Sequence, residues 1–207
     1  MAKQIAAVLA DIRIDAVKIG MLATPAVIAA VAEALQSWAG PVVLDPVLVA
    51  KSGGALLQED AIAALTRCLL PRADLLTPNL PEAARLLDQP LAETTAEAEA
   101  QSFALLDLGA RAVLMKGGHA AGPICTDLLI TPDGVLALTA PRIATRNTHG
   151  TGCSLSSAIA AELAKGQSLP LALRRAHGWL QGAIAAADGL GIGRGHCPVH
   201  HFHEVWL

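Results

Sequence analysis

The chain has 207 residues, a formal net charge of −3 and 53% hydrophobic residues, so it can bury the core of one α/β domain. It contains no tyrosine, two phenylalanines and three tryptophans, too few rings for base stacking, and no run of Lys or Arg supplies a basic surface. These features exclude the usual classes of nucleic-acid-binding protein.

Apolar stretches in the chain are too short for a signal peptide or a membrane-spanning helix. Residues 5–9 are apolar, but Asp11 follows closely, and longer apolar runs are interrupted by Gly, Pro or charged residues. The cysteines form no C-x-x-C pair, which favours free thiols in a reducing compartment: Cys68, Cys125, Cys153 and Cys197. We therefore expect a cytoplasmic protein without membrane contact.

Hydrophobic periodicity and capping signals predict the secondary structure in chain order. An amphipathic helix is predicted over residues 2–12, and a second begins with Thr24 as its N-cap and Pro25 as its first residue. Strands are predicted over 16–20, 42–44, 74–77, 111–115, 125–131 and 135–139, the last two forming a hairpin around Pro132-Asp133-Gly134. The second helix runs to about residue 38, and further helices cover 55–70, 81–87, 94–108, 153–165 and 169–187.

Strands alternate with helices through most of the chain, which predicts βαβ units, a parallel sheet and helices on both faces. No repeat or linker divides the chain, so we expect one domain over residues 1–207. Ligands bind such sheets beyond the carboxyl ends of the strands. Several candidate residues follow predicted strands and should line one cleft there: Met21, Asp45, Asn79, Glu82 and Lys116.

A glycine-rich loop at residues 147–153 precedes a predicted helix that is rich in alanine. Gly150 and Gly152 allow close backbone approach, and the unpaired N–H groups of the helix start favour a bound phosphate. The same field would favour a thiolate at Cys153. The alternative is an ordinary turn with Thr151 as N-cap and Cys153 as a small buried residue.

This loop and its flanks resemble the signature of the phosphomethylpyrimidine kinases of thiamine biosynthesis, which belong to the ribokinase-like superfamily. The resemblance rests on residues 148–156 (THGTGCSLS), 15–22, 43–47, 76–83, 113–119 and 198–203, in family order over nearly the whole chain. It implies a three-layer α/β/α fold with a mostly parallel central sheet. It also implies ATP and Mg²⁺ as cofactors, a small pyrimidine as substrate and a homodimer.

The resemblance assigns the chemistry of phosphoryl transfer to the glycine-rich loop. Cys153 would accept the proton of the substrate hydroxyl, at a position that is Asp in most ribokinase relatives. Backbone N–H groups of Gly150, Thr151, Gly152 and Cys153 would stabilise the moving phosphoryl group. Thr148 would contribute to nucleotide binding. Lys116 would neutralise ATP phosphates, although a lysine at a strand end can also extend to solvent.

The magnesium and substrate roles also come from the resemblance. Asn79 and Glu82 match the superfamily spacing that holds Mg²⁺ and its water, and the same spacing forms a capping box. Asp45 is a candidate oxygen ligand of Mg²⁺, or simply a residue that begins a turn. Met21 and Val47 correspond to apolar contacts of the pyrimidine ring.

Two further segments carry residue types found in binding sites. The loop 51–54 (KSGG) could fold over a phosphate, as the resemblance implies. Histidines and a cysteine gather near the C-terminus, but their spacing fits no standard zinc site, so we expect a docked tail: His196, Cys197, His200, His201 and His203. His149 is expected to have a structural role in the glycine-rich loop.

The implied activity is ATP-dependent phosphorylation of 4-amino-5-hydroxymethyl-2-methylpyrimidine and then of its monophosphate. A pyridoxal-type vitamin kinase is the first alternative, because both substrates are small aromatic rings with a hydroxymethyl group. The second is a non-catalytic ATP-binding remnant. The family normally has several dozen residues before the point that matches Met1, including the first strand, so we expect an N-terminally truncated fold whose first helix lies well inside it.

Overall fold

The computed structural model describes residues 1–48, 57–119 and 122–206. Six strands form one sheet in the order β1-β2-β3-β4-β5-β6. They span Val17–Ile19, Val42–Leu44, Leu75–Leu76, Val113–Met115, Ile124–Thr131 and Gly134–Pro141. Strands β1 to β4 are parallel, and the β5–β6 hairpin joins antiparallel to β4. The predicted, mostly parallel sheet is confirmed.

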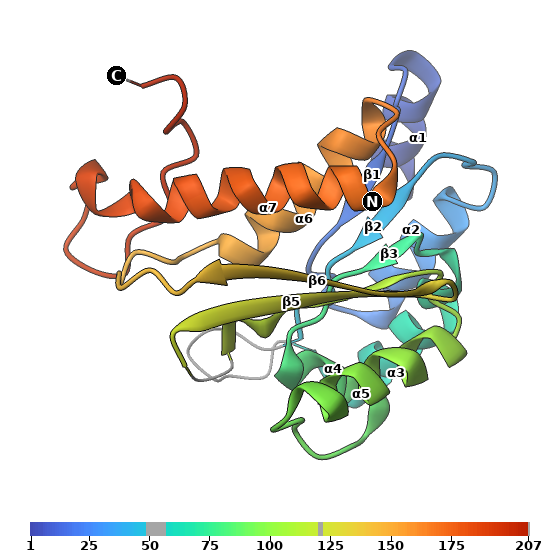
Figure 1. The fold of residues 1–207 in the computed structure, drawn as a ribbon. Helices are drawn as coiled ribbons and strands as arrows, with labels where there is room; N and C mark the ends of the chain where they lie inside the picture. The colour runs from blue at the N-terminus through green and yellow to red at the C-terminus, as the bar shows by residue number, and fades with distance from the viewer. Residues whose placement is uncertain (49–56, 120–121, 207) are drawn as a thin grey trace.

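Helices cover both faces of this sheet (Figure 1). On one face lie α2, α3, α4 and α5, which span Pro25–Ala34, Glu59–Cys68, Leu80–Leu87 and Thr95–Asp107. On the other lie α6 and α7, which span Thr151–Ala164 and Leu169–Ala185. The described residues also form three short 3₁₀ helices, Leu70–Arg72, Gly117–His119 and Ala187–Leu190 (η1, η2 and η3).

Side chains that alternate along the buried strands divide the core into two layers. In β2, Val42 and Leu44 pack toward α2 to α5, whereas Val43 packs toward α6 and α7. All three are fully buried. Burial on both faces explains why this strand is a continuous run of apolar residues, two of them β-branched, rather than an alternating one.

Local capping signals placed several helix starts correctly. The Thr24 side chain accepts a hydrogen bond from the N–H of Val27, and Pro25 is the first helical residue. Thr94 and Glu97 form a complete capping box at the start of α5. The helix over 25–38 was predicted too long, because α2 ends at Ala34. The predicted start of a helix at residue 55, and the loop 51–54, lie outside the described residues.

The first helix differs most from expectation. Helix α1 forms over Ala2–Asp11, but none of its residues is buried. Val8 is 45% exposed and the flanking Ile12 is 55% exposed, so the expected position well inside the fold is wrong. In Figure 1 the helix projects beyond the sheet, where it packs on α2 through Ile5.

Candidate active site

The glycine-rich loop turns directly into α6. Gly150 is the N-cap, with φ of 80° in the left-handed region that glycine adopts without strain. The helix therefore begins at Thr151, and the alternative with Thr151 as N-cap is wrong. The N–H groups of Thr151, Gly152 and Cys153 belong to the first turn, where the helix offers them no acceptor. The helix dipole adds positive potential there, which suits an anion, and the phosphate site at this loop stays a prediction.

The C-terminal tail holds this loop in place. The backbone N–H of His149 donates to the carbonyl of Cys197 at 3.2 Å, and the N–H of Val199 donates to the carbonyl of His149 at 3.4 Å. His201 Nε2 lies 2.8 Å from Ser154 Oγ in the first turn of α6. The docked tail is confirmed, whereas these bonds involve only the backbone of His149, so the structural role of its side chain stays a prediction. Within the described residues, no group of three His, Cys, Asp or Glu side chains could hold a metal ion.

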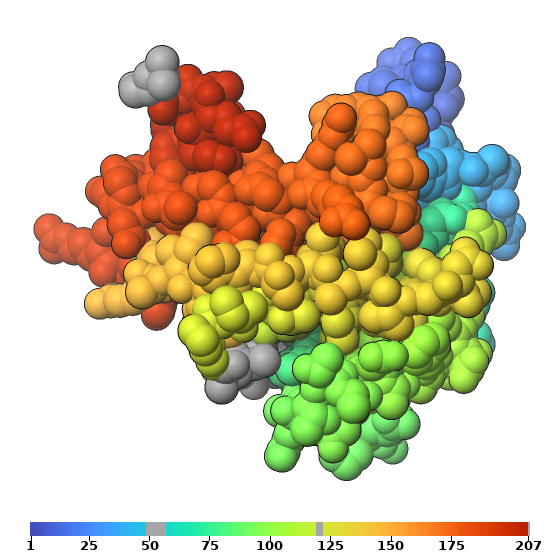
Figure 2. All heavy atoms as spheres, viewed as in Figure 1, coloured from blue at the N-terminus to red at the C-terminus, as the bar shows by residue number. Residues whose placement is uncertain are grey.

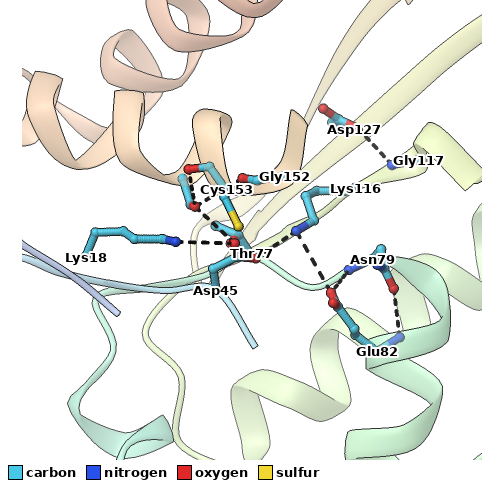
Figure 3. A network of polar contacts seen from close by, with 11 residues as sticks. Lys18, Asp45, Thr77, Asn79, Glu82, Lys116, Gly117, Asp127, Gly152 and Cys153 are labelled. Carbon is cyan, nitrogen blue, oxygen red and sulfur yellow. Dashed lines mark hydrogen bonds and ion pairs between the residues drawn. The ribbon is translucent and has the colours of Figure 1, made fainter. Parts of the chain in front are cut away.

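Asp45 is the centre of the polar network below the loop (Figure 3). Its side chain follows β2 and is almost completely buried. The carboxylate lies 2.9 Å from Lys116 Nζ and 3.7 Å from Lys18 Nζ. It also accepts hydrogen bonds from the hydroxyls of Thr77 and Ser156, at 3.3 and 3.2 Å. Burial alone would raise the pKa of Asp45, but Lys116 above all, then Lys18 and Ser156, bring that pKa below its ordinary value.

The thiol of Cys153 points from α6 into this network (Figure 3). Cys153 is exposed, so its interpretation as a small buried residue is wrong. Partial desolvation of the sulfur, and then the negative charge of Asp45, nevertheless raise the pKa of the Cys153 thiol. Lys18 and Lys116 oppose this change without reversing it. The expectation of a thiolate favoured at the helix start is therefore wrong for the protein without ligands, because that expectation omitted the neighbouring carboxylate.

Asn79 and Glu82 stand at the start of α4 and form a complete capping box. The N–H of Glu82 donates to Asn79 Oδ1 at 2.9 Å, and the N–H of Asn79 donates to Glu82 Oε2 at 2.8 Å. Burial raises the pKa of Glu82 to about 7, although Lys116 and the N–H of Asn79 act against it. The capping interpretation is confirmed, and the backbone N–H of Leu48 also donates to the Glu82 carboxylate.

Replacement of Glu82 by Gln is expected to remove a pH dependence of stability. The pKa of Glu82 is about 7 in the folded protein and 4.5 ordinarily. Between these values the unfolded chain releases the proton first, so folding loses stability as the pH rises, by ~3 kcal/mol in total. Glutamine can preserve the capping box. Urea unfolding with EDTA, at about pH 5 and about pH 8, should show a larger loss for wild type than for Glu82→Gln. Equal losses would contradict the prediction.

Lys116 lies between the two carboxylates and the glycine-rich loop. Its ammonium is 2.9 Å from Asp45 and 3.9 Å from Glu82, and its side chain is only 13% exposed. A Cβ atom added to Gly152 would lie 3.2 Å from Lys116 Nζ, so this ammonium lies next to the glycine-rich loop. The interpretation of Lys116 as a lysine extended to solvent is therefore wrong.

The other predicted residues lie at the same edge of the sheet but outside this network. Met21 follows β1 and is 51% exposed, and Val47 is partly buried two residues after Asp45. Thr148 is partly buried in the glycine-rich loop. Their roles as substrate or nucleotide contacts stay predictions. Sequence reasoning missed four polar residues near the site: Lys18, Thr77, Ser156 and Asp127.

An open groove of about 920 Å³ lies beside Cys153 and Gly150. It runs along α6 and α7, and Trp179 and His201 also line it. Figure 2 shows the corresponding hollow between the C-terminal tail and α6.

No helix in the described part of the chain is long and apolar enough to cross a membrane.

A glycine-rich helix start, a largely buried lysine and a thiol meet at the carboxyl ends of parallel strands, an arrangement expected of an enzyme of phosphoryl transfer. A family model described as phosphomethylpyrimidine kinase matches residues 1–200. The chain is 50% identical over 207 residues to a hydroxymethylpyrimidine/phosphomethylpyrimidine kinase of Salmonella typhimurium, covering all of this chain and 78% of that protein. The chain belongs to the phosphomethylpyrimidine kinase family.

Solved structures agree with this assignment. A Bacillus subtilis pyridoxal kinase in an ADP complex superposes with a TM-score of 0.90 at 31% identity, over 98% of this chain and 76% of that chain. A phosphomethylpyrimidine kinase of Clostridium difficile gives a TM-score of 0.76 at 34% identity, over 88% of this chain and 74% of that chain. The fold is thus shared by kinases of two vitamin classes.

Proposed function

We propose that the chain uses ATP to phosphorylate 4-amino-5-hydroxymethyl-2-methylpyrimidine and then its monophosphate, as steps of thiamine diphosphate biosynthesis. The observation that carries this proposal is the convergence of Cys153, Lys116 and the first turn of α6. The 50% identity to kinases named for these two substrates supports the choice of pyrimidine.

In the proposed reaction, the substrate hydroxyl oxygen attacks the γ-phosphorus of ATP and the bond to ADP breaks. Cys153, as thiolate, accepts the hydroxyl proton. The N–H groups of Thr151, Gly152 and Cys153 stabilise the charge on the transferred phosphoryl group. Lys116 neutralises charge on the ATP phosphates from below the loop. Lys18 and Lys116 oppose the effect of Asp45 on the thiol, although its pKa stays above the ordinary value in the protein without ligands.

Magnesium fits this site through Glu82. Mg²⁺ prefers oxygen ligands, binds few protein carboxylates and retains waters together with substrate phosphates. The carboxylate of Glu82 is fixed by Asn79 and lies 3.9 Å from Lys116, so it can hold a hydrated ion beside the phosphates. Asp45 is less suited, because both of its oxygens already face ammonium and hydroxyl groups. The ion would supply charge neutralisation when bound.

A pyridoxal-type kinase is the second candidate. The structural likeness to a pyridoxal kinase, with a TM-score of 0.90, favours it, whereas the sequence identity of that protein is only 31%. The pyrimidine kinases are 50% identical over the whole chain, so we prefer the pyrimidine. A homodimer, which the family resemblance implies, is a further proposal that light scattering of the purified chain tests.

ADP release by the purified chain, with Mg-ATP and hydroxymethylpyrimidine, tests the proposed function. The monophosphate and pyridoxal serve as parallel substrates. Turnover that depends on the two pyrimidines, and is much weaker with pyridoxal, is the expected result. Preferential use of pyridoxal would support the second candidate. ATP binding without turnover on any substrate would contradict catalysis and favour a non-catalytic ATP-binding chain.

Replacement of Gly152 by Ala is expected to lower phosphoryl transfer more than stability. The added Cβ would lie 3.2 Å from Lys116 Nζ, the flexible end of a side chain that can move, so the fold should tolerate it. The methyl group would occupy the place where a phosphate approaches the loop. We expect kcat/KM for ATP to fall about tenfold or more, while the melting temperature changes by only a few degrees. Gly178→Ala, in α7 at a position where an added Cβ meets no atom within 4 Å, is the matched control. An unchanged kcat/KM would contradict the prediction.

A further inference from the structure

Asp127 of β5 is a carboxylate close to the site that the proposed reaction does not use, and its side chain is only 13% exposed. Its Oδ1 accepts a hydrogen bond of 2.8 Å from the backbone N–H of Gly117 (Figure 3). On the side of α7, His177 Nε2 lies 4.0 Å from its Oδ2. Burial raises the pKa of Asp127. Removing a carboxyl group from water costs free energy, so the position of Asp127 needs an explanation. Its hydrogen bond to the Gly117 N–H suggests one.

Gly117 is the residue directly after Lys116, and the chain here is held from two sides. The N–H of Lys116 donates to the carbonyl of Pro78 at 2.8 Å, which joins it to the segment after β3. On the other side, a Cβ atom added to Gly117 would lie 1.8 Å from the carbonyl oxygen of Thr126. Only glycine permits this approach, and the approach brings the Gly117 N–H to the carboxylate of the next residue along β5.

We propose that Asp127 is a positioning residue for phosphoryl transfer. By accepting the Gly117 hydrogen bond, it fixes the backbone from which the Lys116 side chain extends toward Asp45, Glu82 and the glycine-rich loop. Without the acceptor, the turn after β4 would shift toward solvent, and the Lys116 ammonium would move away from the glycine-rich loop. This inference rests on the proposed function for the role of Lys116.

A double-mutant cycle tests the route through Lys116. Asp127→Leu removes the acceptor with a side chain of similar branching, and Asp127→Ala repeats the test with a smaller one. Each is made in the wild-type and in the Lys116→Ala background. The readouts are kcat/KM for ATP and the affinity for a non-hydrolysable ATP analogue by calorimetry. Asp133→Ala, exposed in the turn of the same hairpin, is the control.

We expect loss of the Asp127 acceptor to lower both readouts about tenfold or more in the wild-type background. In the Lys116→Ala background the same change should cost less than about threefold, because the side chain that Asp127 positions is gone. Asp127→Asn keeps an acceptor oxygen and should recover most of the loss. The KM for the pyrimidine should change less than the KM for ATP.

Two results would overturn the inference. Equal losses in both backgrounds would show that Asp127 acts independently of Lys116, and losses no larger than those of Asp133→Ala would show no role at all. Failure of the proposed function is distinguishable, because wild type would then turn over no pyrimidine while the calorimetric cycle still reports on Lys116.

Discussion

The Cys153→Ala variant is expected to lose turnover by a factor of about 10²–10⁴ in kcat, the usual contribution of a positioned proton acceptor. Its affinity for ATP should change little, because the N–H groups of the first turn of α6 and the Lys116 ammonium remain in place. Cys68→Ala is the matched control, since Cys68 is a free thiol in α3, packed on the apolar core. A Cys153→Ala variant with wild-type kcat would contradict the proposed role of the thiol.

The pH profile of kcat gives a sharper test of the same role. Burial and Asp45 raise the pKa of the Cys153 thiol, so thiolate-dependent turnover should increase as the pH rises above neutrality. Asp45→Asn removes the neighbouring charge and should move this increase to lower pH. Steady-state rates between about pH 6 and about pH 10 measure both effects. If kcat rises at the same pH in Asp45→Asn as in wild type, ionisation of the thiol does not control the rate.

Features of the fold that depend on neighbours in the chain were predictable. The capping boxes at Asn79 and Thr94 follow from side chains three residues apart, and β2 follows from its β-branched run. The exposure of α1 was not predictable, because its amphipathic pattern says which face is apolar but not whether another element covers that face. The structure places this helix beyond the edge of the sheet, with Val8 largely exposed.

In the candidate site, too, the features set by neighbouring residues were predictable and those set by distant residues were not. The anion loop is local, since Gly150 and α6 are adjacent in the chain. The partners of Asp45 are not, because Thr77 is 32, Lys116 is 71 and Ser156 is 111 residues away. Parallel strands bring such residues to one edge, and the position of a residue after its strand indicates that edge. The pairing of Asp45 with two lysines, and its effect on Cys153, required the three-dimensional arrangement.

Asp45→Asn should destabilise the folded protein more than any other single charge removal proposed above. The carboxylate is 1% exposed and faces the ammonium groups of Lys18 and Lys116. Removal of one partner from a buried ion pair typically costs about 3–5 kcal/mol, because the remaining charge stays uncompensated. The two lysine side chains are 20% and 13% exposed, so water can reach them and the lower end of that range is expected.

Urea unfolding at neutral pH measures this free energy, and Asp15→Asn is the control. Asp15 pairs with Arg13 at 2.8 Å, but both side chains are well exposed, so that variant should lose less than about 1 kcal/mol. The pKa of Asp45 is held below its ordinary value of 3.8, so the stabilisation exists above that pH and is lost as the pH falls below it. The difference between wild type and Asp45→Asn should therefore shrink in acid. The free energies of unfolding of wild type and Asp45→Asn could instead differ little at neutral pH, or differ more in acid. Either result would mean that the ion pairs of Asp45 with the two lysines do not stabilise the fold.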